Sequence, residues 1–172
     1  MLRDRKKIEW LASRWLLHEL LGNENDRQVC LKDEHGKPYL EGSSQHISLS
    51  HSQNQVAVII SKKCIGIDIQ RVTKKIERIA PKFMRPEEIN SLSKDGQYLE
   101  HLHVFWGAKE CLYKAYGRRG LDFRKHIFVT PFLYTVPFGE CDGRVENDTF
   151  SAQYHIFFEK RNEFILVYAI EK

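Results

Sequence analysis

The sequence predicts an α+β fold. Two segments, from Arg3 to Leu21 and from about Gln97 to Gly117, repeat apolar residues at helical spacing. Between and after them, short runs rich in β-branched and aromatic residues are typical of strands. A chain of 172 residues is long enough for one well-packed domain, with room for two similar halves.

The composition is that of a soluble globular protein, with 42% hydrophobic and 29% charged residues. The net charge of +4 suits an anionic ligand or an acidic partner, but it is too small to indicate nucleic-acid binding. No apolar run reaches the length of a membrane span. The cysteines lack Cys-x-x-Cys spacing, so we expect no zinc ribbon or disulfide framework, and free thiols suit a cytoplasmic location. They are Cys30, Cys64, Cys111 and Cys141.

The first predicted helix ends at Leu21, where Gly22 can cap it. Its start is rich in cations, which oppose the helix macrodipole. These cations indicate a solubility feature, a start cut from a longer protein, or a basic rim for an anionic ligand; they are Arg3, Arg5, Lys6 and Lys7. The stripe that we expect to face the core consists of Ile8, Leu11, Trp15, Leu16 and Leu20.

The rest of the first half is predicted to be short strands and loops. The triplet Ser50-His51-Ser52 is interpreted as a polar loop between two strands; a hydrolase is not indicated, because no Gly-x-Ser-x-Gly elbow occurs. The predicted loop is 22–26, the predicted turn is 33–38, and the predicted strands are 29–31, 39–40, 47–49 and 55–60.

The second half is predicted to begin with a strand and end with an antiparallel meander that packs on the long helix. Pro81 should interrupt a helix over 74–84, and Pro86 should start another helix. The final strands are expected at 126–134, 151–159 and 164–170, with turns at 139–143 and 161–162.

Two polar positions stand out against these patterns. Glu110 and Lys114 share one face of the long helix, and a carboxylate between Lys109 and Lys114 can hold a cation or take a proton. Asp68 and Gln70 share one face of a strand, where an aspartate is disfavoured unless it serves a purpose such as metal binding. The alternatives are an ordinary surface pair on the helix and a strand end at which Asp68 meets water.

Gly66-Ile67-Asp68, followed about 40 residues later by Trp-Gly-Ala-Lys-Glu-Cys-Leu-Tyr-Lys-Ala, resembles the signature of the 4′-phosphopantetheinyl transferases. Three further blocks, at 36–38, 47–52 and 83–88, resemble family blocks and stand in family order. The likeness is strongest to the larger branch, which activates peptide and polyketide synthetases. It implies two similar α+β halves related by a pseudo-twofold, 1–62 and 63–172, with the first half shortened at its start.

The resemblance also implies a reaction. The family transfers 4′-phosphopantetheine from coenzyme A to a serine of an acyl or peptidyl carrier protein, with Mg²⁺ as cofactor, and releases 3′,5′-ADP. By resemblance Asp68 and Glu110 would bind the metal, with Gln70 contributing directly or through water, and Glu110 and Lys114 would be catalytic. The expected coenzyme A contacts are Lys37, His51, Lys109, Lys114, Arg14 and Arg5. The carrier would be acidic, and neither nucleic acid nor a membrane is expected as a partner.

Three alternatives remain open from the sequence. A degenerate paralogue that binds coenzyme A without catalysis is favoured by Gln70, where many relatives carry an acid, and by the short start. A synthase of the small trimeric branch lacks a comparable first half. A nucleic-acid module would place interleaved aromatic and basic residues on a sheet, which the C-terminal strands do not clearly show.

Overall fold

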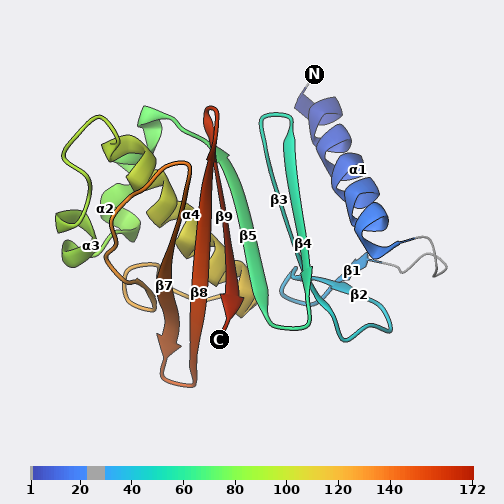
Figure 1. Ribbon diagram of the computed structural model, residues 1–172. Helices are drawn as coiled ribbons and strands as arrows, with labels where there is room; N and C mark the ends of the chain where they lie inside the picture. Colours follow the sequence, from blue (N-terminus) through green and yellow to red (C-terminus); the bar gives the residue numbers. More distant parts are fainter. Residues whose placement is uncertain (1, 23–29) are drawn as a thin grey trace.

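The computed structural model describes residues 2–22 and 30–172 and confirms an α+β fold with two antiparallel sheets (Figure 1). The predicted loop at 23–26 and Val29, the first residue of a predicted strand, lie outside the described residues. The first sheet has the strand order β1-β2-β3-β4, and the second has the order β5-β9-β8-β7-β6. The boundary between the sheets falls between Ser61 and Ile65, while the division into halves at residue 62 stays a prediction.

The first sheet consists of β1 (Cys30–Lys32), β2 (Pro38–Leu40), β3 (His46–Ser52) and β4 (Gln55–Ser61). The predicted loop at 50–52 is wrong, because these residues form the end of β3 and pair with β4. The chain instead turns at Gln53 and Asn54, which both have positive φ angles of 44° and 70°. Alternation along β3 then points Ile47, Leu49 and His51 to one face, and Ser48 and Ser50 to the other.

The second sheet consists of β5 (Ile65–Arg71), β6 (Ile127–Val129), β7 (Phe138–Asn147), β8 (Phe150–Arg161) and β9 (Phe164–Glu171). The last two strands of the predicted meander are confirmed as β8 and β9, including the turn at Asn162, which has a φ of 52°. The strand expected over 126–134 extends only over β6. The predicted turn at 139–143 is wrong, because these residues lie inside β7. A side chain at Gly143 would stand 2.7 Å from Ile156 Cδ1, so this glycine permits close packing rather than a turn.

Short helical segments separate β5 from the long helix α4 (Tyr98–Tyr116). They are η1 (Lys74–Arg78), α2 (Ala80–Phe83) and α3 (Pro86–Asn90). The helix expected over 74–84 is therefore interrupted at Ile79, and Pro81 lies in the first turn of α2. The helix α4 ends at Gly117, as predicted, with a left-handed φ of 72°. Its apolar stripe packs against β5 and β9 and forms the main core, with Leu102, Phe105, Ala108 and Leu112 fully buried.

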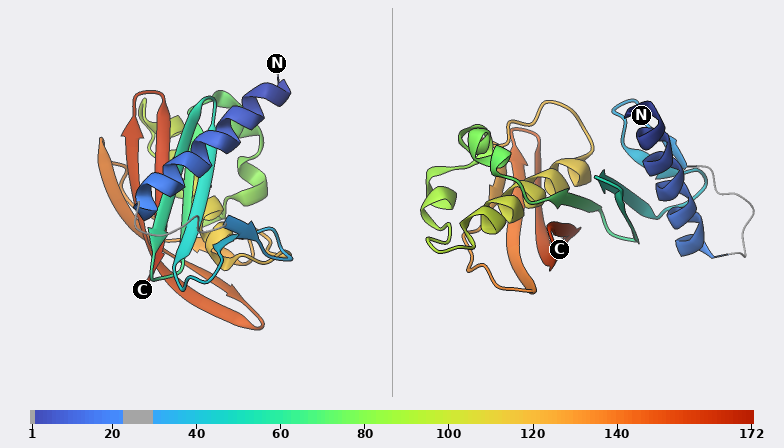
Figure 2. Two further views of the ribbon diagram at one scale, coloured as in Figure 1. Left: turned by 90° about the vertical axis from the view of Figure 1, so that its right-hand side faces the viewer. Right: turned by 90° about the horizontal axis from the view of Figure 1, so that it is seen from above.

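The helix α1 (Leu2–Leu21) lies at the end of the molecule away from α2 and α3 and packs on β3 and β4 (Figure 2). Its predicted apolar stripe is wrong: Ile8, Leu11, Trp15 and Leu20 are exposed, and Leu16 is half-buried. The buried face instead carries Glu9, Ser13 and Leu17, which recur every four residues. No helix in the described ranges is long and apolar enough to cross a membrane.

Candidate active site

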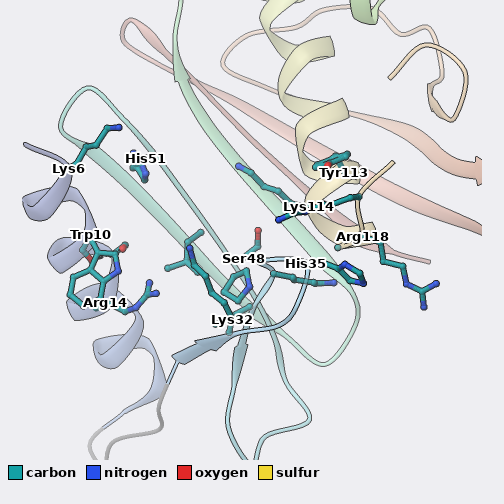
Figure 3. A pocket seen from close by; sticks show the side chains of 18 residues that line it. Lys6, Trp10, Arg14, Lys32, His35, Ser48, His51, Tyr113, Lys114 and Arg118 are labelled. Carbon is teal, nitrogen blue, oxygen red and sulfur yellow. Dashed lines mark hydrogen bonds between the residues drawn. The ribbon is translucent and has the colours of Figure 1, made fainter. Parts of the chain in front are cut away.

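A pocket of about 490 Å³ lies between the first sheet, α1 and the C-terminal end of α4 (Figure 3). It takes side chains from both parts of the chain, since residues of α1, of the 32–38 turn and of β3 face residues 113–119. Seven lysine and arginine residues line it, and among its described lining residues none is acidic. The seven are Lys6, Arg14, Lys32, Lys37, Lys114, Arg118 and Arg119. Such a pocket favours a ligand with several negative charges.

Lys37 joins the first sheet to the end of α4. Its Nζ donates to the Ala115 carbonyl at 2.6 Å, one of the carbonyls that a helix C-terminus leaves without a helical partner. Any side chain at Gly117 would collide with the Lys37 stem, so this glycine serves both the helix cap and the pocket wall. Lys37 lines the pocket, and its contact with coenzyme A stays a prediction.

Lys114 extends from α4 toward β5 and β3. Its Nζ donates to Asp68 Oδ1 at 2.8 Å, to the Ile67 carbonyl at 2.8 Å and to Ser50 Oγ at 3.2 Å. The ion pair therefore joins Lys114 to Asp68, and no hydrogen bond or ion pair joins Lys114 to Glu110 in the described chain. The surface pair that the helix spacing allows is thus not the arrangement in the structure.

Glu110 lies half-buried one turn before Lys114, and among the described residues its carboxylate has no hydrogen-bond or ion-pair partner. Burial raises the pKa of Glu110 above its usual range, and the negative charge of Asp68 raises it further, while Lys114 partly offsets both. A carboxylate with a raised pKa and no partner can accept a proton or bind a cation.

Asp68 and Glu110 are the donors that this site offers to a divalent cation. Their oxygens are the hard ligands that Mg²⁺ prefers, and Mg²⁺ often uses only one or two carboxylates besides water and phosphate. The negative charge of Asp68 contributes to the raised pKa of Glu110, and a cation bound by both carboxylates would offset this repulsion. Within the described chain, no three His, Cys, Asp or Glu side chains gather to hold a metal.

Gln70 is held by His103. His103 Nε2 lies 2.9 Å from the Thr73 nitrogen and 3.1 Å from the Thr73 carbonyl oxygen, and Nδ1 lies 2.9 Å from Gln70 Oε1, an amide oxygen that can only accept, so Nδ1 donates to it. Gln70 Nε2 donates to the His103 carbonyl at 3.0 Å. Both ends of the amide are therefore engaged by His103, and direct metal binding by Gln70 would break this arrangement.

Lys109 does not reach the pocket, so its expected coenzyme A contact is corrected. Its side chain is fully buried, and Nζ donates to Glu88 Oε2 at 2.9 Å and to the carbonyls of Phe123 and Ile127. Glu88 also accepts the backbone N–H groups of Arg85 and Val129. The pair fixes α3 and the 123–127 segment to α4. Lys109 and Lys114 lie about 140° apart around the helix, so their side chains leave it on different faces, and Lys109 is directed to the core.

Two of the residues predicted to contact coenzyme A, Arg5 on α1 and His51 on β3, lie against Glu9. His51 Nδ1 lies 3.1 Å from Glu9 Oε2, and Arg5 Nε donates to Glu9 Oε1 at 3.1 Å. Burial opposes ionisation of Glu9, but bonds from Arg5 and the Asn54 N–H and the nearby His51 outweigh it and lower the pKa of Glu9. His51 and Arg14 line the pocket, whereas Arg5 does not.

Residues 64–166 match the model of the 4′-phosphopantetheinyl transferase superfamily, which is more than half of the chain. The chain belongs to this superfamily.

Curated relatives in this superfamily support the assignment. The chain is similar to the 4′-phosphopantetheinyl transferase gsp of Aneurinibacillus migulanus, with 31% identity over 116 residues, 66% of this chain and 48% of that protein. It is also similar to a 4′-phosphopantetheinyl transferase of Bacillus subtilis, with 31% identity over 88 residues, 49% of this chain and 39% of that protein. The matched part of the chain thus spans about half of these relatives' length, or less.

Several pocket residues of this superfamily member were not expected from the sequence. Trp10 lies on α1 one turn before Arg14, which was expected, and its ring lies 5.2 Å from the Arg14 guanidinium, an arrangement that a helical i, i+4 spacing could have indicated. Arg118 and Arg119 directly follow the C-cap Gly117, and a pair of arginines after a functional helix is the signal that could have found them.

Proposed function

We propose that this protein transfers 4′-phosphopantetheine from coenzyme A to a serine hydroxyl of an acyl or peptidyl carrier protein and releases 3′,5′-ADP. The observation that carries the proposal is the position of Lys114. It lines the cationic pocket and is paired with Asp68, which lies near the free carboxylate of Glu110. Lys114 thus connects the cationic pocket to Asp68 and Glu110, which do not themselves line it.

The pocket suits coenzyme A by charge. Coenzyme A carries a pyrophosphate and a 3′-phosphate, and charge-assisted hydrogen bonds from lysine and arginine are the usual contacts for such groups. Lys37, His51 and Arg14 would hold the nucleotide phosphates from the first half, and Lys114, Arg118 and Arg119 would face them from the second. Trp10 offers an aromatic face in the same pocket.

Asp68 and Glu110 would hold a Mg²⁺ ion, with Gln70 at most joined through water. When bound, the ion supplies positive charge that neutralises the pyrophosphate as 3′,5′-ADP departs. The raised pKa of Glu110 makes this carboxylate a suitable base for the serine proton. Lys114 would stabilise negative charge on the transferred phosphate, sharing its ammonium with Asp68.

The finer assignments belong to the same proposal. Each half combines one long helix with one antiparallel sheet, which supports two halves related by a pseudo-twofold. The carrier partner is proposed to be acidic, in keeping with the net charge of +4. A cytoplasmic location is supported by the four cysteines, which are all free thiols.

A protein that binds coenzyme A without transfer is the alternative, and the engagement of Gln70 by His103 favours it, because two carboxylates alone remain for the metal. Mass spectrometry of apo carrier proteins, incubated with this protein, coenzyme A and Mg²⁺, tests both. A gain of one phosphopantetheine mass is expected on at least one carrier. Coenzyme A binding without any mass gain would favour the alternative and contradict transfer.

A further inference from the structure

Ser50 on β3 connects the two sheets at the centre of the site. Only 7% of its surface is exposed, and its hydroxyl meets three groups from other elements. Oγ donates to Asp68 Oδ1 at 2.9 Å, accepts the Ile69 N–H at 3.2 Å and accepts the Lys114 ammonium at 3.2 Å. Ser50 therefore contacts both members of the ion pair and the strand that carries one of them.

The direction of these hydrogen bonds follows from the groups involved. A hydroxyl has one proton to donate and two lone pairs to accept. The Ile69 N–H and the Lys114 ammonium can only donate, so the hydroxyl proton goes to Asp68. The proton and both lone pairs of the Ser50 hydroxyl are thus engaged, which fixes the orientation of the hydroxyl and of the Asp68 carboxylate that accepts from it.

Asp68 Oδ1 thus receives two donors, the Ser50 hydroxyl and the Lys114 ammonium. Its second oxygen, Oδ2, has no hydrogen-bond partner within the described ranges. We propose that Ser50 is a positioning residue: it holds Asp68 through Oδ1 so that Oδ2 is free to bind the cation, and it orients Lys114 beside it. This inference rests on the proposed transfer reaction and adds a role to the first sheet, which sets the geometry of residues in the second.

Ser48 provides a matched control within the same strand. It is buried on the same face of β3, and its Oγ accepts the Ile67 N–H of β5 at 3.1 Å. Each serine therefore accepts one backbone N–H of β5, which is an edge strand of the second sheet in the described part of the chain, so these N–H groups point away from β9. Ser50 differs in its contacts with Asp68 and Lys114. Loss of the Ser48 hydroxyl removes one hydrogen bond between the sheets, whereas loss of the Ser50 hydroxyl removes two and also its contact with Lys114, so only loss of Ser50 releases the carboxylate.

The test compares Ser50→Ala, Ser48→Ala and Ser50→Thr in the intact protein. Thermal unfolding reports the bond between the sheets, electron paramagnetic resonance of added Mn²⁺ reports metal affinity in the presence of coenzyme A, and carrier modification reports kcat. Both alanine variants should lose thermal stability, and Ser50→Ala should lose at least as much as Ser48→Ala, because it removes more hydrogen bonds. Ser50→Ala should also lose about 10- to 100-fold in Mn²⁺ affinity and kcat, the usual effect of removing a hydrogen bond that orients a metal ligand. Ser50→Thr, which keeps the hydroxyl, should recover most of both.

The outcomes separate this inference from the proposed reaction. If the wild-type protein modifies a carrier but Ser50→Ala matches the wild type in Mn²⁺ affinity and kcat, the positioning role is wrong and the reaction stands; Ser48, which lines the pocket, serves as a control for stability and Mn²⁺ affinity only. If no carrier is modified but Ser50→Ala alone weakens Mn²⁺ binding, the positioning role stands and the reaction fails. A wild-type protein that neither binds Mn²⁺ nor modifies a carrier would overturn both.

Discussion

The two long helices of this protein are held in place by different kinds of contact. α4 buries a continuous apolar stripe against β5 and β9, and its one buried cation, Lys109, is fully paired. α1 buries Glu9, Ser13 and Leu17 and leaves Ile8, Leu11 and Trp15 exposed. The helix that carries the proposed catalytic groups thus rests on apolar packing, whereas the helix that lines the cationic pocket rests on polar contacts together with Leu17 and Leu21.

The largest expected effect breaks the buried pair beneath α4. Lys109→Met removes the cation and leaves the Glu88 carboxylate buried without its countercharge. This should lower the free energy of unfolding by about 3–5 kcal/mol, measured by urea denaturation. Adding Glu88→Gln removes the uncompensated charge but keeps an acceptor for only one of the Arg85 and Val129 N–H groups, so it should restore part of the loss. If Lys109→Met alone is as stable as the wild type, Lys109 has no structural role.

The next effect compares two positions on α1. Leu17 is 3% exposed and packs with Leu40 and Ile47, whereas Trp15 is 65% exposed. Leu17→Ala should therefore destabilise the protein by about 2–3 kcal/mol, and Trp15→Ala by less than about 0.5 kcal/mol. Chemical denaturation of the two variants measures this contrast. If Trp15→Ala loses as much stability as Leu17→Ala, or more, the apolar stripe expected from the sequence faces the core after all.

A smaller effect concerns the polar face of α1. The folded state lowers the pKa of Glu9 below its ordinary value of 4.5, so its ionised form stabilises the fold above that pH, and this contribution is lost as pH falls through the lowered value. Glu9→Gln should therefore reduce stability at neutral pH by about 0.5–1 kcal/mol, because the partners Arg5 and His51 are partly exposed. The difference from the wild type should vanish below the lowered pKa. Thermal unfolding of both proteins across this pH range measures it, and a pH-independent difference would contradict the ionic contribution.

The contrast between the helices also explains what the sequence could predict. The stripe of α4, the cap at Gly117 and the C-terminal strands follow from periodicity and local preference, because the packing that decides them is apolar. The proximity of Asp68 and Lys114 was expected from two motifs. On α1 the same periodicity failed, because hydrogen bonds to Glu9 come from residues distant in the sequence and leave no repeating pattern.

Two further misses have related causes. Lys109 and Lys114 look equivalent in the sequence, but their side chains leave α4 in different directions, and only the partners Glu88 and Asp68 distinguish them. Ser50 was expected in a loop, since a polar triplet resembles a turn more than a strand. Its place in β3 depends on β5, whose edge N–H groups need acceptors.

The central claim is that Glu110 is kept as a free carboxylate for catalysis rather than as a stabilising surface pair. Glu110→Gln tests it when carrier modification and thermal unfolding are measured on the same preparation at neutral pH. Loss of a base and metal ligand should lower the transfer rate by about 100-fold or more. Because burial and Asp68 disfavour the charged form of Glu110, the neutral glutamine should leave the melting temperature unchanged or raise it. An unchanged rate with a lowered melting temperature would contradict the account and return Glu110 to an ordinary stabilising role.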